Sequence, residues 1–383
     1  MSTGMPRFAG ARLREAREAR GRTISSLADS IGVSKQAISQ YEHDLASPST
    51  ENMTRIARAL DMPIRFFLTS PTAEDETWTV FYRSMSAATK TARTKAKRRY
   101  GWLRRVVAWL RTYITFPQVR FPAFDLPAQA ERIGEDDIED IASKVRAYWG
   151  IEAGPVPNVT ALLEGAGAIL VRMELQADTL DAFSEWRERE QRPYVILGTD
   201  KASAVRSRYD ASHELGHMIL HRKIPPEALR NAATFKLVEK QAHRFAGAFL
   251  LPADTFADDL YLSGLQTYVS LKAKWQVSIA AMLMRSSQLN LISPDRAQRL
   301  WRNLARRGWR VREPLDDELP IEEPSLVRDS FELLLNKRIV VPGAIEAQLG
   351  IGLRDIEDVC GLQQGVLDQR VGPVLLFPRR NGG

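Results

Sequence analysis

Apolar positions recur at helical spacing in several short groups along the first seventy residues, and polar or glycine positions separate these groups. Thr23 precedes one group and Gly32 follows it, which is the pattern expected around a short helix. Ser34 can then cap a third helix, KQAISQYEHD, after a turn of only three residues, GVS. Two helices joined by so short a turn form a helix-turn-helix unit, whose second helix can enter the major groove of DNA.

The second helix of this predicted unit divides into a buried side and a solvent side. Ile38 is expected to pack beneath the helix. The side chains that remain on the solvent side are Lys35, Gln36, Ser39 and Gln40. Because Gln can pair with adenine edges, and Lys and Ser can reach guanine or phosphate, these four are the candidate DNA-binding residues. A small helical bundle that mediates only protein contacts is the alternative interpretation.

A basic stretch follows this unit. Residues 82–111 contain ten Lys or Arg residues and no Asp or Glu, with tyrosine and tryptophan interleaved. Such a composition suits contact with a nucleic-acid backbone. The spacing of Trp102, Val106 and Trp109 also fits one apolar helix face, so we predict a structural role for these residues. The positive charge can still assist DNA binding, and FPQVRFPAFDLP then predicts an extended linker.

Short runs of β-type residues between 167 and 198 predict a small sheet, and a helical pattern follows from about Ala202 to His221. Gly216 lies inside this predicted helix. A glycine there costs about 1 kcal/mol relative to alanine. A glycine at position 216 is therefore expected to serve a purpose, such as the close approach of a neighbouring strand or a ligand.

The predicted helix carries the sequence HELGH. His213 and His217 lie four residues apart, so both rings project from one helix face and can bind one cation through imidazole nitrogens. Glu214 beside them is poorly placed as a ligand but suited to accept a proton from a metal-bound water. In a chain with five histidines, a chance HExxH has a probability on the order of one in a few hundred.

A catalytic zinc site needs a third protein ligand and one open position. Glu239 lies far enough beyond His217 for the chain to turn and bring a second helix alongside the first, and it is the predicted third ligand. His243, one helical turn further, is either a hydrogen-bond partner of a ligand or an ordinary surface histidine, and the first role is favoured. His221 is expected to cap the helix or pack rather than bind metal.

Two stretches resemble known families. The stretch ISSLADSIGVSKQAISQYEHDLASPSTENMTRIARALDMP resembles the phage-repressor-like helix-turn-helix family, called the XRE or Cro/C1 type. The run LDAFSEWREREQRPYVILGTDKASAVRSRYDASHELGHMILH, followed by EKQAHRFAGAFLLPADTF, resembles the ImmA/IrrE family of metallopeptidase-like proteins. This second resemblance implies that His213, His217 and Glu239 are zinc ligands and that Glu214 is the catalytic base. His243 stands where the family usually has Asn.

The predicted fold is multidomain and mostly α, with a small α+β zincin-like peptidase domain behind an all-α helix-turn-helix domain. Five segments are expected along the chain. They are an XRE-type helix-turn-helix DNA-binding domain at 1–70, a basic connector at 71–125, an ImmA/IrrE-like metallopeptidase domain at 126–255, a helix-turn-helix-like helical region at 256–312 and a C-terminal helical cap at 313–383.

The function implied is that of a DNA-binding, gluzincin-like zinc endopeptidase, whose protein substrate is a partner helix-turn-helix repressor. Members of the resembling family are associated with such cleavage, which releases stress, phage or mobile-element genes. The alternative is a non-proteolytic regulator or antitoxin with a metal-sensing or structural zinc site. Structural zinc sites are closed by four protein ligands, and no second cysteine or well-spaced fourth histidine closes this one, so the ligand count favours catalysis.

Further site features are expected by analogy. Tyr209 and Arg206, just upstream of the histidines, are candidates for stabilising charge in the transition state. The strands at 180–198 offer an edge along which an extended peptide can bind. Cys360 is either an inhibitory zinc ligand or a small buried residue, and the second role is favoured.

Composition and charge indicate the kind of partner and the cellular compartment to expect. A net charge of +7 favours an acidic partner such as nucleic acid, and a single cysteine cannot form an internal disulfide, which favours a cytoplasmic protein. The apolar run VVAWLRTYITF is short and contains Arg111, so no membrane span is expected. Paired DNA half-sites would make a homodimer reasonable.

Overall fold

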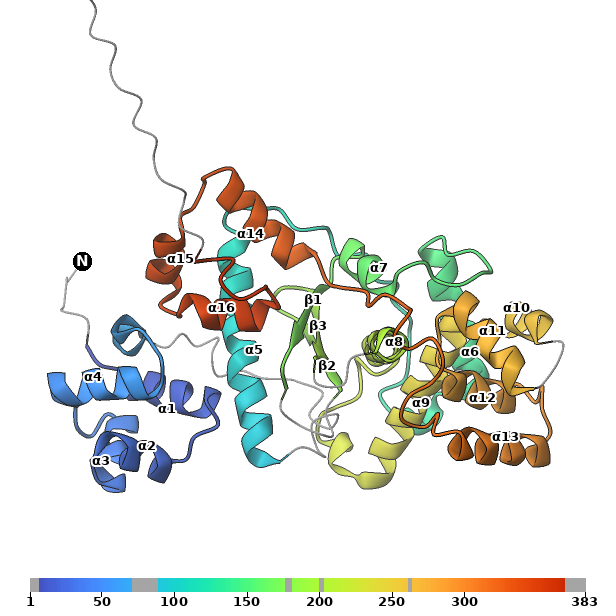
Figure 1. Ribbon diagram of the computed structural model, residues 1–383, viewed down its shortest axis with the longest axis horizontal. Coiled ribbons are helices and arrows are strands. Elements are labelled where there is room, and N and C mark those ends of the chain that lie inside the picture. Colours follow the sequence, from blue (N-terminus) through green and yellow to red (C-terminus); the bar gives the residue numbers. More distant parts are fainter. Residues whose placement is uncertain (1–6, 71–88, 176–180, 200–202, 261–263, 369–383) are drawn as a thin grey trace, which may run out of the picture. The chain divides into compact units, whose positions relative to one another are not determined.

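The computed structural model describes residues 7–70, 89–175, 181–199, 203–260 and 264–368. The chain divides into two compact units. The first unit joins residues 1–76, 93–114 and 328–383, and the second joins 77–92 and 115–327. Helices dominate both units, and the second contains a small sheet (Figure 1). The predicted multidomain, mostly α fold is therefore confirmed.

The first unit contains the N-terminal helices, most of the long basic helix and the C-terminal helices (Figure 1). Its elements are α1 (Gly10–Ala19), α2 (Ile24–Ile31), α3 (Lys35–Glu42), α4 (Thr50–Ala59), η1 (Ile64–Leu68), α5 (Lys90–Leu110), α14 (Leu326–Asn336), α15 (Pro342–Leu349) and α16 (Leu353–Cys360).

The turn between α2 and α3 forms for the reasons that its sequence suggested. The Thr23 hydroxyl accepts a hydrogen bond from the backbone N–H of Ser26 at 3.0 Å, which caps α2. Gly32 ends α2 with a positive φ of 71°, a conformation that glycine adopts without steric cost. The Ser34 hydroxyl caps α3 by accepting from the backbone N–H of Ala37 at 3.1 Å. The predicted helix-turn-helix geometry follows directly.

A buried ion pair fixes α3 against α1. Arg17 donates from Nε to Oε1 of Glu42 at 2.5 Å and from Nη2 to Oε2 at 2.9 Å, so the two planar groups meet side by side. Both side chains are almost fully buried. Arg17 also donates from Nη1 to the backbone carbonyl of Arg22 at 2.7 Å. These bonds set the orientation of α3 and hence of its solvent side.

The tryptophans of α5 are structural, as their spacing predicted. Trp102 is fully buried and donates from Nε1 to Oε1 of Glu15 at 2.6 Å. Trp109 donates from Nε1 to Oε1 of Gln348 at 2.6 Å. Val106, on the same face of the helix, is also buried. The aromatic stripe therefore packs inside the first unit, which leaves it unavailable for stacking on bases.

Part of the positive charge on α5 is paired within the first unit. The ion pairs join Arg98 to Glu18 at 2.7 Å, Arg105 to Glu15 at 3.3 Å and Arg99 to Asp358 at 3.6 Å. The share of the charge left for a nucleic-acid backbone is correspondingly smaller. Residues 71–88 of the predicted connector lie outside the described residues.

The second unit contains the sheet and the helices that follow it in sequence (Figure 1). Its elements are η3 (Ala130–Arg132), α6 (Glu135–Tyr148), α7 (Val159–Gly165), β1 (Ile169–Met173), β2 (Ala182–Arg187), β3 (Arg192–Gly198), α8 (Ala204–Leu220), η4 (Ala228–Arg230), α9 (Ala232–Leu250), α10 (Ala253–Asp259), α11 (Leu265–Trp275), α12 (Ile279–Gln288) and α13 (Pro294–Arg306).

The sheet has the strand order β1-β3-β2. β1 pairs with β3 in parallel, whereas β2 pairs with β3 in antiparallel register and places Ser184 opposite Val195. The three predicted β-type runs are thus confirmed as strands. Helix α8 packs against β2 and β3 as well as against α9, and apolar side chains of α8 and α9 share one core with Trp275 of α11.

The acidic segment after α13 belongs to the second unit down to residue 327. Glu313 accepts from the backbone N–H groups of Ile279 at 2.8 Å and Ala280 at 3.0 Å, at the start of α12. Glu322 accepts in the same way from Val159 at 2.8 Å, at the start of α7. Carboxylates at helix N-termini satisfy free N–H groups and favour the helix dipole, so this segment ties several helices together. In the described part of the chain, no helix is long and apolar enough to cross a membrane.

Candidate metal centre

Two capped helices carry the candidate ligands. Ser203 caps α8 by accepting from the backbone N–H of Arg206 at 3.4 Å, and Asn231 caps α9 by accepting from Ala233 at 2.8 Å and Thr234 at 3.2 Å. The histidines of HELGH lie on α8, and the predicted third ligand lies on α9. The chain therefore turns back after α8 and brings a second helix alongside, as the sequence predicted.

Gly216 lies where the backbone of α9 approaches α8 closely. A Cβ atom at this position would lie 3.2 Å from both Cα and the carbonyl oxygen of Ala242 and 3.2 Å from Cδ1 of Phe245. These distances are shorter than the 3.5–4.0 Å of ordinary carbon contacts. The glycine is needed because a neighbouring backbone approaches, and the neighbour is a helix. This approach brings the side chains of both helices within reach of one ion.

The three predicted ligand residues converge between the helices. Nε2 of His213 and Nε2 of His217 lie 3.0 Å apart. Glu239 places Oε2 at 3.3 Å from Nε2 of His213 and Oε1 at 3.5 Å from Nε2 of His217. Tetrahedral zinc with bonds of about 2.0–2.1 Å places its ligand atoms about 3.3–3.4 Å apart. The spacing of these donors therefore fits a single zinc ion.

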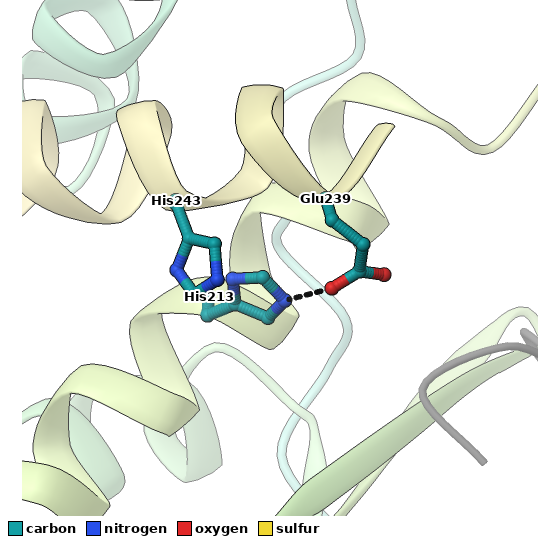
Figure 2. Close-up of side chains that lie close together, drawn as sticks. All are labelled: His213, Glu239 and His243. Carbon is teal, nitrogen blue, oxygen red and sulfur yellow. Dashed lines mark ion pairs between the residues drawn. The ribbon is translucent and has the colours of Figure 1, made fainter. Parts of the chain in front are cut away.

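His243 lies on the other side of His213 from Glu239 (Figure 2). His213, Glu239 and His243 can place one ligand atom each within 4.8 Å of one another, so His243 belongs to the same cluster. The atoms of His213, His217 and Glu239 lie 3.0–3.5 Å apart. His243 is also exposed, whereas His217 is buried. The 3.0–3.5 Å spacing of His213, His217 and Glu239 matches the spacing of ligands around one zinc ion, and His243 is a further donor beside them.

The carboxyl group of Glu214 is hydrogen-bonded to the sheet. The hydroxyl of Ser184 on β2 donates to Oε2 of Glu214 at 2.6 Å. Burial raises the pKa of Glu214 to about 7, against the opposing effects of His213 and of the Ser184 hydrogen bond. A carboxyl group with a pKa near neutrality is suited to accept and return a proton. Ser184 was not identified from the sequence, because only the strand register brings it here.

The two histidines of HELGH have opposite electrostatic settings. Burial tends to lower the pKa of His213, but the hydrogen bond to Glu239 and the nearby carboxylates raise it above its usual value. Burial, followed by the proximity of the other histidines, holds the pKa of His217 well below its usual value. His217 is therefore neutral at physiological pH, and a neutral imidazole is the form that binds metal.

His221 ends α8 and is fully buried. Its Nδ1 lies 3.0 Å from Nδ1 of His217, and its Nε2 lies 3.2 Å from Oε1 of Gln241 on α9. Burial lowers the pKa of His221 to about 3. The expected capping and packing position is thus correct, but the contact with His217 and the role of Gln241 were not identified from the sequence.

A cavity of about 910 Å³ in the second unit reaches the ligand cluster on the side of Glu239 and His243. Tyr209 and Arg206 line it, and Tyr209 donates its hydroxyl to the backbone carbonyl of His243 at 3.1 Å. The cavity's size lies within the range of ligand-binding clefts. Strand β2 is an outer strand of the sheet, but five of its six residues are buried. The cavity is therefore a better place for a substrate than the strand edge.

The candidate DNA-binding residues lie on α3, as their positions required. Lys35, Gln36 and Gln40 are exposed and Ser39 is half-buried, whereas Ile38 is completely buried beneath the helix. The side of α3 available to a major groove is therefore the one that the sequence indicated.

Cys360, at the end of α16 in the first unit, is buried. Burial raises the pKa of its thiol far above the usual value, which opposes formation of a thiolate. This agrees with the favoured interpretation of Cys360 as a small buried residue.

The fold and the ligand cluster define a helix-turn-helix protein that also carries a metallopeptidase-type domain. Residues 164–287 match a peptidase-family model described as the IrrE N-terminal-like domain, and residues 13–67 match a helix-turn-helix model. Both resemblances suspected from the sequence are confirmed by these matches. The chain therefore carries a helix-turn-helix segment and a peptidase-family segment, and the family of the second segment implies a metal cofactor.

Two curated relatives that match the N-terminal part of the chain are named as HTH-type regulatory proteins. The HTH-type transcriptional regulator SutR of Escherichia coli (strain K12) is 34% identical over 67 residues, which cover 18% of this chain and 38% of that protein. The putative HTH-type transcriptional regulatory protein MJ1164 of Methanocaldococcus jannaschii is 42% identical over 52 residues, which cover 14% of this chain and 16% of that protein. The matched part is thus well under half of each relative.

Proposed function

We propose that this protein is a zinc-dependent endopeptidase that binds DNA through α3 and cleaves a partner helix-turn-helix repressor, and so derepresses the stress, phage or mobile-element genes under its control. The proposed zinc ligands are His213, His217 and Glu239, and the proposed general base is Glu214. The observation that carries the proposal is the convergence of two Nε2 atoms and one carboxylate within 3.0–3.5 Å.

The donor set favours catalysis over a structural zinc site. Structural sites are closed by four protein ligands, whereas catalytic sites keep three and leave one position open. His243 is a further donor in the same cluster, and we assign it no metal bond. Zinc bound here would polarise a peptide carbonyl and lower the pKa of water. The buried carboxyl of Glu214 would accept the proton of the attacking water and return it to the leaving amine.

The proposed substrate-binding surface is the cavity beside Glu239. Half-buried Trp301 and Trp309 contribute apolar surface, and Met284 on α12 is 52% exposed there. Apolar walls with a few polar groups are typical of peptide and ligand clefts. Arg206 in the same wall is exposed and is the candidate for stabilising negative charge on a carbonyl oxygen.

Glu214→Gln tests the endopeptidase directly. The variant keeps an oxygen that accepts from Ser184, so zinc content and fold should be unchanged. Loss of the proton acceptor should lower kcat/KM for cleavage of the proposed repressor substrate by about 10²–10⁴-fold. Glu239→Gln is the matched control, because it should lose both zinc and cleavage. A Glu214→Gln protein that still cleaves at the wild-type rate, or that regulates transcription fully without cleaving, would favour the non-proteolytic alternative.

The DNA-binding proposal has its own test. Sites selected by the full-length protein from random-sequence DNA should lose specific binding when Lys35 and Gln36 are both replaced by alanine. Arg58→Ala removes an exposed charge from α4 and is the control. It should weaken binding to all sequences by similar, small factors. Unchanged affinity of the double variant for its selected sites would refute base reading by α3.

A further inference from the structure

The hydrogen bonds around Gln241 fix the orientation of its amide. Its Nε2 donates to the backbone carbonyl of Ala130 at 2.7 Å and to that of Ile133 at 2.9 Å, at the two ends of η3. Both partners are carbonyl oxygens, so only the NH₂ group can face them. Oε1 of Gln241 must therefore point at Nε2 of His221, 3.2 Å away, and it can only accept.

This orientation determines where His221 carries its proton. Because Oε1 of Gln241 is an acceptor, Nε2 of His221 must be the N–H donor. His221 is fully buried, and its two ring nitrogens face an imidazole and an amide oxygen, neither of which carries a negative charge. A buried imidazole in such surroundings is neutral and has a single N–H. The Nδ1 atom of His221 is therefore unprotonated and can only accept a hydrogen bond.

The same reasoning extends to His217. Its Nδ1 lies 3.0 Å from Nδ1 of His221, which has no proton to offer, so His217 must carry its own proton on Nδ1 and donate it. We propose that His221 and Gln241 are positioning residues that hold the proton of His217 on Nδ1. The Nε2 atom of His217 is then unprotonated and can bind the metal. The chain of bonds runs from η3 through α9 to the end of α8.

This inference rests on the proposed role of His217 as a metal ligand. It explains why Nε2 of His217 carries no proton before the metal binds. In water, a free imidazole exchanges its proton between the two nitrogens. In this protein the other arrangement would set two lone pairs against each other, either between His217 and His221 or between His221 and Gln241. A partner on the far nitrogen of a ligating histidine fixes its tautomer and orientation and strengthens metal binding.

The ring-proton positions can be measured without metal. The chain has five histidines, so an NMR spectrum that correlates ring nitrogens with ring protons is simple to assign with single His variants. In the metal-free, full-length protein, His217 should be protonated on Nδ1 and His221 on Nε2. A proton on Nε2 of His217 would overturn the proposal, whatever the protein's activity.

A pair of equally sized variants provides the second test. His221→Asn retains an oxygen close to the place of Nδ1, whereas His221→Leu has nearly the same shape and no acceptor. The leucine variant should bind zinc about 10–100-fold more weakly than the asparagine variant, in competition with a chromophoric chelator. Met218→Leu, a buried change on the same helix, controls for repacking. Equal zinc affinities of the two His221 variants would overturn the proposal.

The outcomes separate this inference from the proposed function. A wild-type protein that binds no zinc would contradict the proposed zinc site, and the NMR result on the same sample would still decide where His217 carries its proton. A protein that binds zinc with the predicted difference between the two variants, but cleaves no repressor, would keep this inference and reject the endopeptidase.

Discussion

Replacing Gly216 by alanine tests whether the close approach of α8 and α9 builds the metal centre. Alanine in a helix interior is favoured over glycine by about 1 kcal/mol. At this position the new Cβ would meet Cα and the carbonyl oxygen of Ala242 at 3.2 Å, and Phe245 at 3.2 Å. Two of these atoms belong to the backbone of α9, so relief requires a shift of the helix rather than a change of rotamer.

The expected magnitude follows from these opposing contributions. Overpacking of a buried contact costs about 1–3 kcal/mol. Subtracting the gain in helix propensity leaves Gly216→Ala between neutral and about 2 kcal/mol less stable than wild type. Gly247 inside α9 is the matched control, because its Cβ would meet Arg285 and Gln288 at an ordinary 3.6 Å. Gly247→Ala should therefore gain up to about 1 kcal/mol.

Thermal unfolding of the metal-free proteins measures this difference. For a unit of this size, 1 kcal/mol corresponds to about 2–4 °C in Tm, so Gly247→Ala should unfold at a higher temperature than Gly216→Ala, by up to roughly 12 °C. A shift of α9 by a few tenths of an ångström also moves Glu239 away from the two Nε2 atoms, so Gly216→Ala should bind zinc more weakly. Equal Tm values together with wild-type zinc affinity in Gly216→Ala would refute the reasoning.

Three further results are expected. Glu239→Gln should lower zinc affinity far more than His243→Gln in a chelator competition, and equal losses would make His243 a ligand. Arg17→Met should destabilise the helix-turn-helix by about 3–5 kcal/mol in urea unfolding, because Glu42 stays buried without its partner. Arg14→Met is the control, since it breaks a more exposed pair and should cost less than about 1 kcal/mol. Zinc affinity should fall as pH drops below about 7, because protons compete for His213, whose pKa is raised above its usual value, and a pH-independent affinity would contradict ligation by His213.

The sequence was most informative where one residue determines local geometry. Capping residues such as Thr23 and Ser34 and the positive φ of Gly32 act within a few positions along the chain, so the helix-turn-helix could be predicted. The i, i+4 spacing of His213 and His217 likewise fixed their common face. The need for a close neighbour at Gly216 was also evident, although its identity as a helix was not.

The parts that the sequence did not reveal depend on contacts between distant segments. Ser184 reaches Glu214 because of strand register, which a three-stranded sheet sets through all of its pairings. The side-chain amide of Gln241 is oriented by two carbonyl groups more than a hundred residues earlier in the chain. Local periodicity does not predict either contact, because Ser184 and Gln241 look like ordinary polar positions on a strand and on a helix.

These distant contacts determine how much of the protein the metal centre includes. HELGH alone sets two rings on one helix, but metal binding and proton transfer require the other groups to be held within about half an ångström of their working positions. Ser184 orients the carboxyl of Glu214, the close contact at Gly216 sets the distance of Glu239, and His221 orients His217. Changes in β2 or η3 that touch no ligand should therefore reduce zinc affinity or cleavage while the fold stays intact. The centre is a property of the packing between α8, α9 and the sheet, and not of the five-residue motif alone.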